Sequence, residues 1–330
     1  MSAIGVVIIG RNEGERLKNC IRSLSNIDVK IVYVDSNSSD DSVDYVKQQG
    51  FDVVELDMSI PFSAARARNE GYRYLLSKYD DIDYLQFVDG DCEVCEGWIS
   101  SAKQHLLSNL ELASVCGRRK ERFPERTLYN KLCDIEWNTP VGPARSTGGD
   151  FMCRKQALLD VDGFNPQVIA GEEPEMCFRM RQKGWSLERL DAEMTLHDAN
   201  MTSLGQWWKR CERSGHAYAQ GFFMHGNGAE KYCRADVMRI LLWSLGVPVF
   251  IVFCAIVFSP WLLLLFLVFP LKIAQIAKTQ VKYFGFGVGL AYSASLIFCK
   301  FPQLKGLMSF LFKQLTGRRF QIIEYKGTAD

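Results

Sequence analysis

The sequence lacks the markers of several well-defined protein classes. No Gly-x-Gly-x-x-Gly motif follows the first apolar run, so the glycine-rich turn of a dinucleotide-binding site is missing. The chain has four histidines, and Cys92 and Cys95 form a Cys-x-x-Cys pair without a second pair at zinc spacing. We therefore expect the eleven cysteines to be reduced thiols, most of them buried in a core.

Charge is missing from one long stretch near the C-terminus. Between Arg239 and Lys272 no charged residue occurs for 32 positions, and Ser259-Pro260 lies near the middle. One helix needs about 20 apolar residues to cross a hydrocarbon core, and proline interrupts a helix. We expect a helical hairpin over about 239–272 that spans or deeply enters a bilayer. A buried helical domain is the alternative, but residues 262–269 have no polar face.

Acidic residues are rare in the same region. Residues 230–330 hold 12 Lys/Arg against 4 Asp/Glu, a balance of +8, whereas residues 1–229 hold 27 against 34, a balance of −7. A segment that is both basic and apolar suits anionic lipid headgroups, not nucleic acid. Basic residues at both ends of the hairpin place those ends in the cytosol. Because the N-terminus shows no signal peptide, we expect the domain before the hairpin to face the cytoplasm.

A third apolar stretch covers residues 283–299 and is followed by a basic tail. If this stretch crossed the bilayer, the tail would lie outside, against the positive-inside rule. We expect the segments from 283 to 316 to lie partly in the membrane interface, with a third span as the alternative.

Short apolar runs alternate with helix-like segments in the first two-thirds of the chain. Runs at 5–9, 31–34 and 51–56 predict strands, and a helix is expected over 63–78. Alternation at intervals of about thirty residues is typical of a doubly wound, mostly parallel α/β sheet. We predict an α/β domain at 1–229, followed by a membrane region at 230–330.

Residues 84–88 predict a further strand, which ends in Asp89-Gly90-Asp91. In an open parallel sheet, ligands bind at the carboxyl ends of the strands. Two carboxylates this close repel each other unless a cation lies between them, and oxygen ligands suit Mg²⁺ or Mn²⁺, which in turn suit a diphosphate. A polar turn is the alternative, because Asp and Gly are common in turns.

A second acidic cluster, Glu172-Glu173-Pro174-Glu175, follows Gly171. Pro174 suits the first turn of a helix and glutamates suit its positive end, so helix capping explains part of the pattern. Capping does not require three glutamates. Upstream, the glycines of 146–150 permit a close approach of the backbone to a ligand.

The order of these motifs resembles family 2 of the glycosyltransferases, with the fold called GT-A, over roughly residues 3–225. The resemblance implies transfer of a sugar from a nucleotide-sugar donor with inversion at the anomeric carbon, and a divalent metal cofactor, Mg²⁺ or Mn²⁺. The segments that match are Arg11-Asn12-Glu13, Val34-Asp35-Ser36-Asn37-Ser38-Ser39-Asp40, Ala67-Arg68-Asn69-Glu70-Gly71, Asp89-Gly90-Asp91, Gly163-Phe164 and Gly171-Glu172-Glu173-Pro174-Glu175.

The resemblance also assigns roles to single residues. Asp35 would hold the nucleobase, and the metal would be bound by Asp89, Asp91 and His197, although a lone histidine is more often structural. The residues that would bind the donor are Asn12, Glu13, Asp35, Arg68, Asn69 and Asp89.

An acceptor hydroxyl needs a base on the opposite face of the sugar ring to take its proton. Glu173 is the first candidate and Glu172 the second; the family usually has Glu-Asp here, whereas this chain has Glu-Glu. A lipid phosphate is already ionised and needs no base, so the acidic cluster favours a hydroxyl acceptor. Gly149 and Asp150 are assigned to the acceptor side.

The segment Gln206-Trp207-Trp208-Lys209-Arg210 resembles, with different spacing, the Gln-x-x-Arg-Trp motif of polysaccharide synthases. Trp207 and Arg210 are assigned to the acceptor side on this basis. A helix with tryptophans at the membrane interface is an equal alternative. Because no apolar helix precedes the α/β domain, we expect transfer of a single sugar and not processive synthesis.

The resemblance and the membrane region together imply an enzyme at the inner (plasma) membrane. Its acceptor would be a hydroxyl of a lipid-linked saccharide, such as a polyprenyl diphosphate glycan, in cell-surface polysaccharide biosynthesis. The alternatives are transfer onto polyprenyl phosphate and a noncatalytic membrane scaffold with the same fold.

Overall fold

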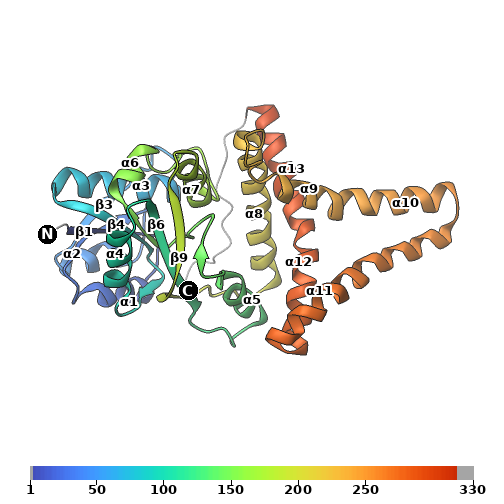
Figure 1. Cartoon of the computed structure of the whole chain (residues 1–330), viewed down its shortest axis with the longest axis horizontal. Coiled ribbons are helices and arrows are strands. Elements are labelled where there is room, and N and C mark those ends of the chain that lie inside the picture. The colour runs from blue at the N-terminus through green and yellow to red at the C-terminus, as the bar shows by residue number, and fades with distance from the viewer. Residues whose placement is uncertain (1–2, 318–330) are drawn as a thin grey trace. The chain divides into compact units, whose positions relative to one another are not determined.

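The computed structural model describes residues 3–317, which form two compact units (Figure 1). The first unit consists of residues 3–126 and 133–200, and the second of residues 127–132 and 201–317. Helix α8 (Leu204–His225) therefore groups with the second unit, although we expected it at the end of the α/β domain. The predicted basic tail from residue 318 onward lies outside the described residues.

The described residues of the first unit form a mixed sheet of nine strands in the order β3-β2-β1-β4-β8-β6-β9-β5, with β7 paired to β9. The pairings within β3-β2-β1-β4 are parallel, whereas β8 is antiparallel to both β4 and β6. This confirms the predicted fold class, with β8 as an antiparallel strand inside the sheet. The strands are β1 (Ala3–Gly10), β2 (Lys30–Asp35), β3 (Asp52–Glu55), β4 (Ile82–Asp89), β5 (Cys92–Val94), β6 (Leu112–Glu121), β7 (Gly142–Pro143), β8 (Phe151–Arg154) and β9 (Ser186–His197).

The central strands are apolar on both faces because both faces of the sheet are covered. Val6, Val7 and Ile8 are consecutive residues of β1, so their side chains alternate between the faces, and all three are fully buried. The helices along this part of the chain are α1 (Glu15–Leu24), α2 (Ser42–Gln48), α3 (Ala64–Lys78), α4 (Trp98–Ser108), α5 (Leu128–Trp137), α6 (Lys155–Asp160) and α7 (Glu172–Gln182).

Helix α3 packs closely on β1 and carries two of the predicted site residues. It begins after Ser63, whose hydroxyl accepts a hydrogen bond from the Arg66 amide at 3.1 Å, as an N-cap residue does. A Cβ atom at Gly71 would collide with Val7 of β1, so only glycine allows this approach. The close contact holds Arg68 and Asn69, one turn earlier, against the carboxyl edge of the sheet.

In the second unit, α8 packs against α13 (Lys300–Thr316). The two helices approach so closely that a side chain at Gly215 would collide with the backbone of Gln303, and one at Gly306 with the backbone of Glu212. His216 is buried in this contact, with its ring 5.4 Å from that of Phe310 in an edge-to-face arrangement. Glycine at these positions therefore sets the distance between the helices.

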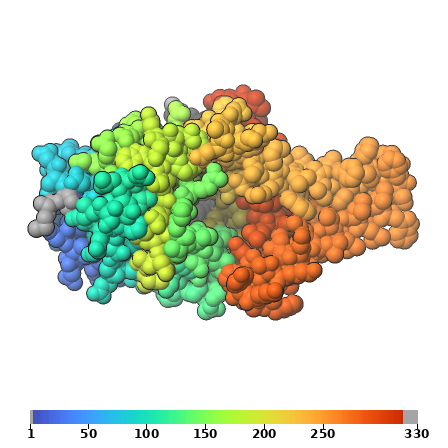
Figure 2. All heavy atoms as spheres, viewed as in Figure 1, coloured from blue at the N-terminus to red at the C-terminus, as the bar shows by residue number. Residues whose placement is uncertain are grey.

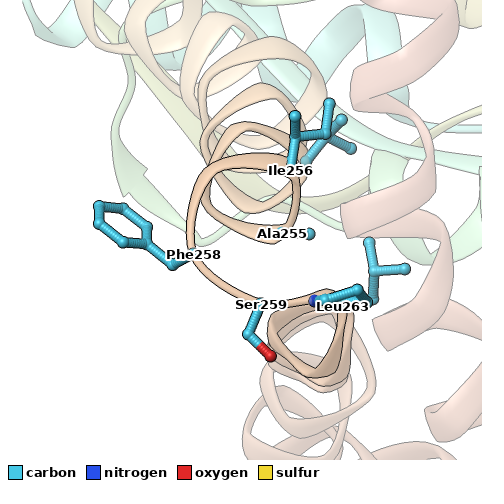
Figure 3. Close-up of a pocket in the computed structure, with 7 residues that line it drawn as sticks. Ala255, Ile256, Phe258, Ser259 and Leu263 are labelled. Carbon is cyan, nitrogen blue, oxygen red and sulfur yellow. The ribbon is translucent and has the colours of Figure 1, made fainter.

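Two further helical segments of the second unit are long and apolar enough to cross a membrane, by length and composition. They cover Arg234–Val257 and Pro260–Phe284, so the chain breaks at 258–259, where the sequence predicts the turn of a hairpin. The first contains α9 (Arg234–Leu241), η1 (Leu242–Gly246) and α10 (Val247–Val257), and the second η2 (Pro260–Leu267) and α11 (Val268–Phe284). The residues at this turn line an apolar pocket, seen in Figure 3; they are Val252, Ala255, Ile256, Phe258, Ser259, Pro260 and Leu263.

The hairpin exposes large apolar side chains (orange in Figure 2). Ile256 is 80% exposed, Trp261 78% and Phe258 73%, which is costly in water and normal in lipid. The third apolar stretch folds as α12 (Phe286–Phe298), whose 13 residues are too few for a span. Among residues 3–317 only the two hairpin segments meet the criteria for a span.

Candidate active site

Strand β4 brings Asp89 and Asp91 to the carboxyl edge of the sheet. Asp89 is paired with Ile9 of β1, and the Gly90 amide donates a hydrogen bond to the Ile9 carbonyl at 2.8 Å, which fixes the turn. The Asp89 side chain is 27% exposed, whereas Asp91 is buried. The two carboxylates therefore have different environments although one glycine separates them.

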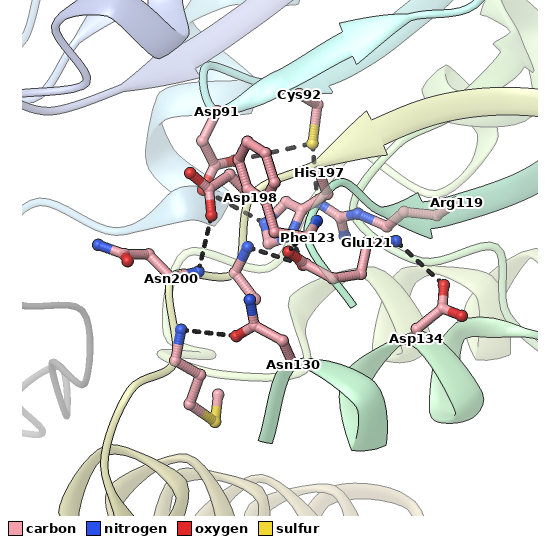
Figure 4. Close-up of polar contacts among 12 residues, drawn as sticks. Asp91, Cys92, Arg119, Glu121, Phe123, Asn130, Asp134, His197, Asp198 and Asn200 are labelled. Carbon is pink, nitrogen blue, oxygen red and sulfur yellow. Dashed lines mark hydrogen bonds and ion pairs between the residues drawn. The ribbon is translucent and has the colours of Figure 1, made fainter. Parts of the chain in front are cut away.

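The end of β9 places His197 beside Asp91 (Figure 4). Nε2 of His197 lies 3.3 Å from Oδ2 of Asp91, and potential ligand atoms of Asp91, Cys92 and His197 all lie within 4.8 Å of one another. Nδ1 of His197 is buried and has no hydrogen-bond partner among the described residues. A buried carboxylate beside the Nε2 atom of an imidazole offers the oxygen and nitrogen ligands that a divalent cation such as Mn²⁺ or Mg²⁺ accepts.

Two arginines hold the carboxylate of Asp89. The Arg68 guanidinium donates from Nη2 to Asp89 Oδ1 at 2.8 Å and from Nη1 to Glu172 Oε1 at 2.6 Å. Arg119 donates from Nη2 to Asp89 Oδ2 at 2.9 Å. Gly149 lies against this group, since a Cβ atom there would be 2.8 Å from Asp89 Oδ2. Arg68 thus connects the carboxylate pair of β4 to the acidic start of α7.

Glu173, the second of the three glutamates at the start of α7, has different partners. Its Oε1 accepts hydrogen bonds from the Thr147 amide at 2.5 Å, the Thr147 hydroxyl at 2.8 Å and the Cys177 thiol at 2.9 Å. Burial raises the pKa of Glu173 above its usual value, and these hydrogen bonds oppose that effect. Glu172 points to the Asp89 side of the site, whereas Glu173 contacts the glycine-rich 146–150 segment.

Asp150 is fully buried, and its contacts indicate a supporting role that differs from the predicted acceptor-side role. Its Oδ1 accepts from the Asp89 amide at 2.9 Å, and its Oδ2 from the Thr195 hydroxyl at 2.7 Å. Arg119 Nε lies 3.2 Å from the same Oδ2. A carboxylate with these partners fixes the backbone at Asp89, and the acceptor-side role of Asp150 stays a prediction.

Asn69 is likewise used by the fold. Its Nδ2 donates to the Phe164 carbonyl at 2.7 Å, and its Oδ1 accepts from the Phe164 amide at 2.9 Å. These bonds join α3 to the Gly163-Phe164 turn and occupy both polar atoms of the side chain. The donor-binding role of Asn69 stays a prediction, and its contacts favour positioning of the turn.

The remaining predicted donor residues lie at the ends of β1 and β2. Asp35 is buried and accepts from the Ser38 amide at 2.8 Å, while the Ser38 hydroxyl accepts from the Asn12 amide at 2.9 Å. Glu13 forms an ion pair with Arg16 at 2.9 Å. The two strand ends are thus joined at the edge where a nucleobase is expected.

Trp207 and Arg210 lie on α8 in the second unit. Trp207 is buried. Their acceptor-side assignment stays a prediction.

Three residues of the site are missed by sequence reasoning. Arg119 and Glu121 lie on β6, and the Trp137 ring lies 4.6 Å from the His197 ring and 5.3 Å from Cζ of Arg119. The run around Arg119 has the pattern of a solvated strand end. The spacing of two between Arg119 and Glu121, which puts both side chains on one face of a strand, is the signal that could have found them.

The fold and the carboxylate-rich edge define a GT-A glycosyltransferase architecture. Residues 5–162 match the family model described as Glycosyl transferase family 2, which agrees with the resemblance predicted from the sequence.

Solved structures support the fold. The mannosyltransferase PcManGT from Pyrobaculum calidifontis, in complex with GDP-Man and Mn²⁺, aligns with a TM-score of 0.65 over 95% of this chain and 88% of that chain, at 12% identity. S. aureus TarS 1–349 aligns with a TM-score of 0.54 over 98% of this chain and 95% of that chain, at 13% identity. At these identities the likeness concerns the fold alone.

A curated relative also matches in sequence. The pre-mycofactocin glycosyltransferase of Mycobacterium tuberculosis is 25% identical over 217 residues, which are 63% of this chain and 45% of the relative. The chain therefore spans less than half the length of the curated relative it matches.

Proposed function

We propose that this protein is a metal-dependent inverting glycosyltransferase that moves one sugar from a nucleotide-sugar donor to a hydroxyl of a lipid-linked saccharide. The observation that carries the proposal is the carboxylate pair at the end of β4, in which Asp89 is joined through Arg68 to Glu172. Donor-side and acceptor-side carboxylates thereby meet at one guanidinium group.

The donor would lie along the strand ends, with Asp35 near the nucleobase and the diphosphate near Asp89. Asp89, Asp91 and His197 would hold a divalent cation, which as a Lewis acid stabilises the charge that develops on the leaving diphosphate. Both Mg²⁺ and Mn²⁺ are compatible with these ligands. Arg68 and Arg119 already surround Asp89 and add positive charge at the same place.

Glu173 is the proposed base. Its raised pKa makes it a stronger proton acceptor than an exposed glutamate, and the Thr147 and Cys177 contacts fix its carboxylate. Glu172 is the second candidate, but its ion pair with Arg68 favours a role in positioning that arginine.

The hairpin would hold the enzyme at the plasma membrane, with the catalytic domain facing the cytoplasm. The exposed apolar residues of the hairpin support membrane insertion, and the basic composition of the region supports contact with anionic headgroups. A lipid-linked acceptor, such as a polyprenyl diphosphate glycan of cell-surface polysaccharide biosynthesis, would lie in the same membrane.

The test uses the full-length protein in detergent with a membrane lipid extract and a panel of nucleotide sugars. We expect one donor to be consumed, with sugar transferred to the lipid fraction only when Mn²⁺ or Mg²⁺ is present. Asp91→Asn should abolish transfer while the circular dichroism spectrum stays unchanged. Transfer that survives both EDTA and this substitution would refute the metal-dependent mechanism.

A second candidate is transfer onto polyprenyl phosphate. The observation that favours it is the burial of Glu173, which is 3% exposed, because an ionised phosphate acceptor needs no base. Pure polyprenyl phosphate offered as the sole acceptor distinguishes the two reactions. Turnover with this lipid would favour the second candidate, and turnover only with a saccharide-bearing lipid would favour the first.

A further inference from the structure

Acidic side chains from two different parts of the sheet, Asp91 before β5 and Glu121 on β6, lie on opposite sides of His197 on β9. Glu121 and His197 are directly paired residues of these parallel strands, while Cys92 of β5 pairs with His197 from the other side. The Arg122 amide donates to the His197 carbonyl at 2.8 Å, which locks this register. The position of the imidazole is therefore set by three strands.

The two ring nitrogens of His197 face different carboxylates. Nε2 lies 3.3 Å from Asp91 Oδ2, and Nδ1 lies 3.9 Å from Glu121 Oε2. Asp91, Glu121 and His197 are all buried. The Trp137 ring meets the imidazole edge-to-face at 4.6 Å, which limits rotation of the ring.

Glu121 is itself held rigidly. Its Oε1 accepts from the Phe123 amide at 3.0 Å, and its Oε2 from the Ala199 amide at 2.9 Å (Figure 4). The same Oε2 lies 3.9 Å from Nδ1 of His197, so the carboxylate charge faces that nitrogen. The strand ends thus fix a negative charge beside Nδ1.

We infer that Glu121 is a positioning residue that orients His197 as a cation ligand. This inference rests on the proposed metal site and adds a residue to it. A neutral imidazole carries one N–H and one lone pair, and a carboxylate beside one nitrogen favours the proton on that nitrogen, which leaves the lone pair of the other nitrogen for a metal. With Glu121 at Nδ1, the proton belongs on Nδ1 and the lone pair on Nε2, beside Asp91.

The test measures Mn²⁺ binding to the purified full-length protein by electron paramagnetic resonance, with pulsed detection of nitrogen coupled to the metal. The wild type should show nitrogen coupling, and His197→Gln should lose it. Glu121→Gln should lower the Mn²⁺ affinity by about 10- to 100-fold, the usual effect of removing a carboxylate that orients a metal-binding histidine.

Asp134→Asn is the matched control, because Asp134 accepts from the Glu121 amide at 3.1 Å and pairs with Arg118 on the same strand. This variant should keep the affinity and the nitrogen coupling of the wild type. Wild-type affinity and coupling in Glu121→Gln would overturn the inference.

The wild-type spectrum provides a second check, which does not depend on whether Glu121→Gln folds. Bound Mn²⁺ without nitrogen coupling would overturn the role of His197 and Glu121 and leave the Asp89 and Asp91 site intact. Failure of the wild type to bind Mn²⁺ at all would instead contradict the proposed metal-dependent function.

Discussion

At the scale of single side chains, the two adjacent glutamates of α7 have separate tasks. Glu172 is tied to the donor side through Arg68, whereas Glu173 is tied to Thr147 in the glycine-rich segment. Adjacent residues on a helix point in directions about 100° apart, so this division follows from helical geometry. The sequence predicts the cluster but does not show which member faces which partner.

Glu173→Gln should reduce transfer by about 10²- to 10⁴-fold, the usual contribution of a general base, without weakening nucleotide binding. The amide oxygen of glutamine can still accept from Thr147, so folding should be preserved. Glu172→Gln is the matched variant, and it should raise the KM for the donor because Arg68 loses one of its two carboxylate partners. The measurements are kcat and KM for both variants, with nucleotide affinity from calorimetry.

Full activity of Glu173→Gln would show that Glu173 is not the base. Equal loss of nucleotide binding in both variants would show that the two glutamates act as one structural unit.

At the scale of elements, the sequence predicts the strands that have apolar runs and misses β8 and β9. The 5–9 and 84–88 runs correspond to β1 and β4, whose residues are buried on both faces. By contrast, β8 has four residues, and β9 alternates charged with apolar residues, so neither has a continuous apolar run. The contact of Glu121 with His197 depends on the β6–β9 register. The two residues are 76 positions apart in the sequence, so no local pattern predicts their pairing.

The α8–α13 helix pair should lose stability in acid through His216. Burial, with a smaller contribution from the charge of Lys313, lowers the pKa of His216 from 6.5 to about 4. Because the folded state favours the neutral imidazole, this stabilisation is present above pH 6.5 and is lost as the pH falls toward 4. The loss between pH 7 and pH 4.5 should be roughly 2 to 3 kcal/mol.

Chemical unfolding of the full-length protein at the two pH values measures this loss. His216→Leu should remove that part of the pH dependence, and His225→Gln, near the end of the same helix, is the matched control. An unchanged pH dependence in His216→Leu would contradict this explanation.

At the scale of the whole molecule, the sequence predicts a membrane region from the absence of charge, and the structure supplies two helices of suitable length. The boundary between the parts was harder to predict. Helix α8 has an amphipathic sequence that suits either part, and its packing against α9 and α13 groups it with the second unit. Such a contact depends on glycines 91 residues apart, Gly215 and Gly306, and leaves no pattern in the local sequence.

A lysine in the hairpin should weaken membrane binding. Ile256 and Leu264 are 80% and 60% exposed, and a charge in the apolar region of a bilayer costs about 2.5 to 3.5 kcal/mol. We expect Ile256→Lys combined with Leu264→Lys to move protein from the liposome fraction to the soluble or aggregated fraction in a flotation assay.

Leu110→Lys is the control, because Leu110 is 73% exposed but lies in the first unit. It should float with the liposomes like the wild type. Flotation of the double variant at the wild-type level would argue against insertion of the hairpin.

The ion pairs of Arg68 and Arg119 with Asp89 affect the order in which cation and nucleotide bind. A cation that arrives alone meets a carboxylate whose charge is already neutralised, so it should settle first at Asp91 and His197. A bound diphosphate would offer Arg68 and Arg119 a second anion, and Asp89 would then be available as a further ligand for the cation. Nucleotide and cation should therefore strengthen each other's binding, and the cation should bind tightly only when the donor is also bound.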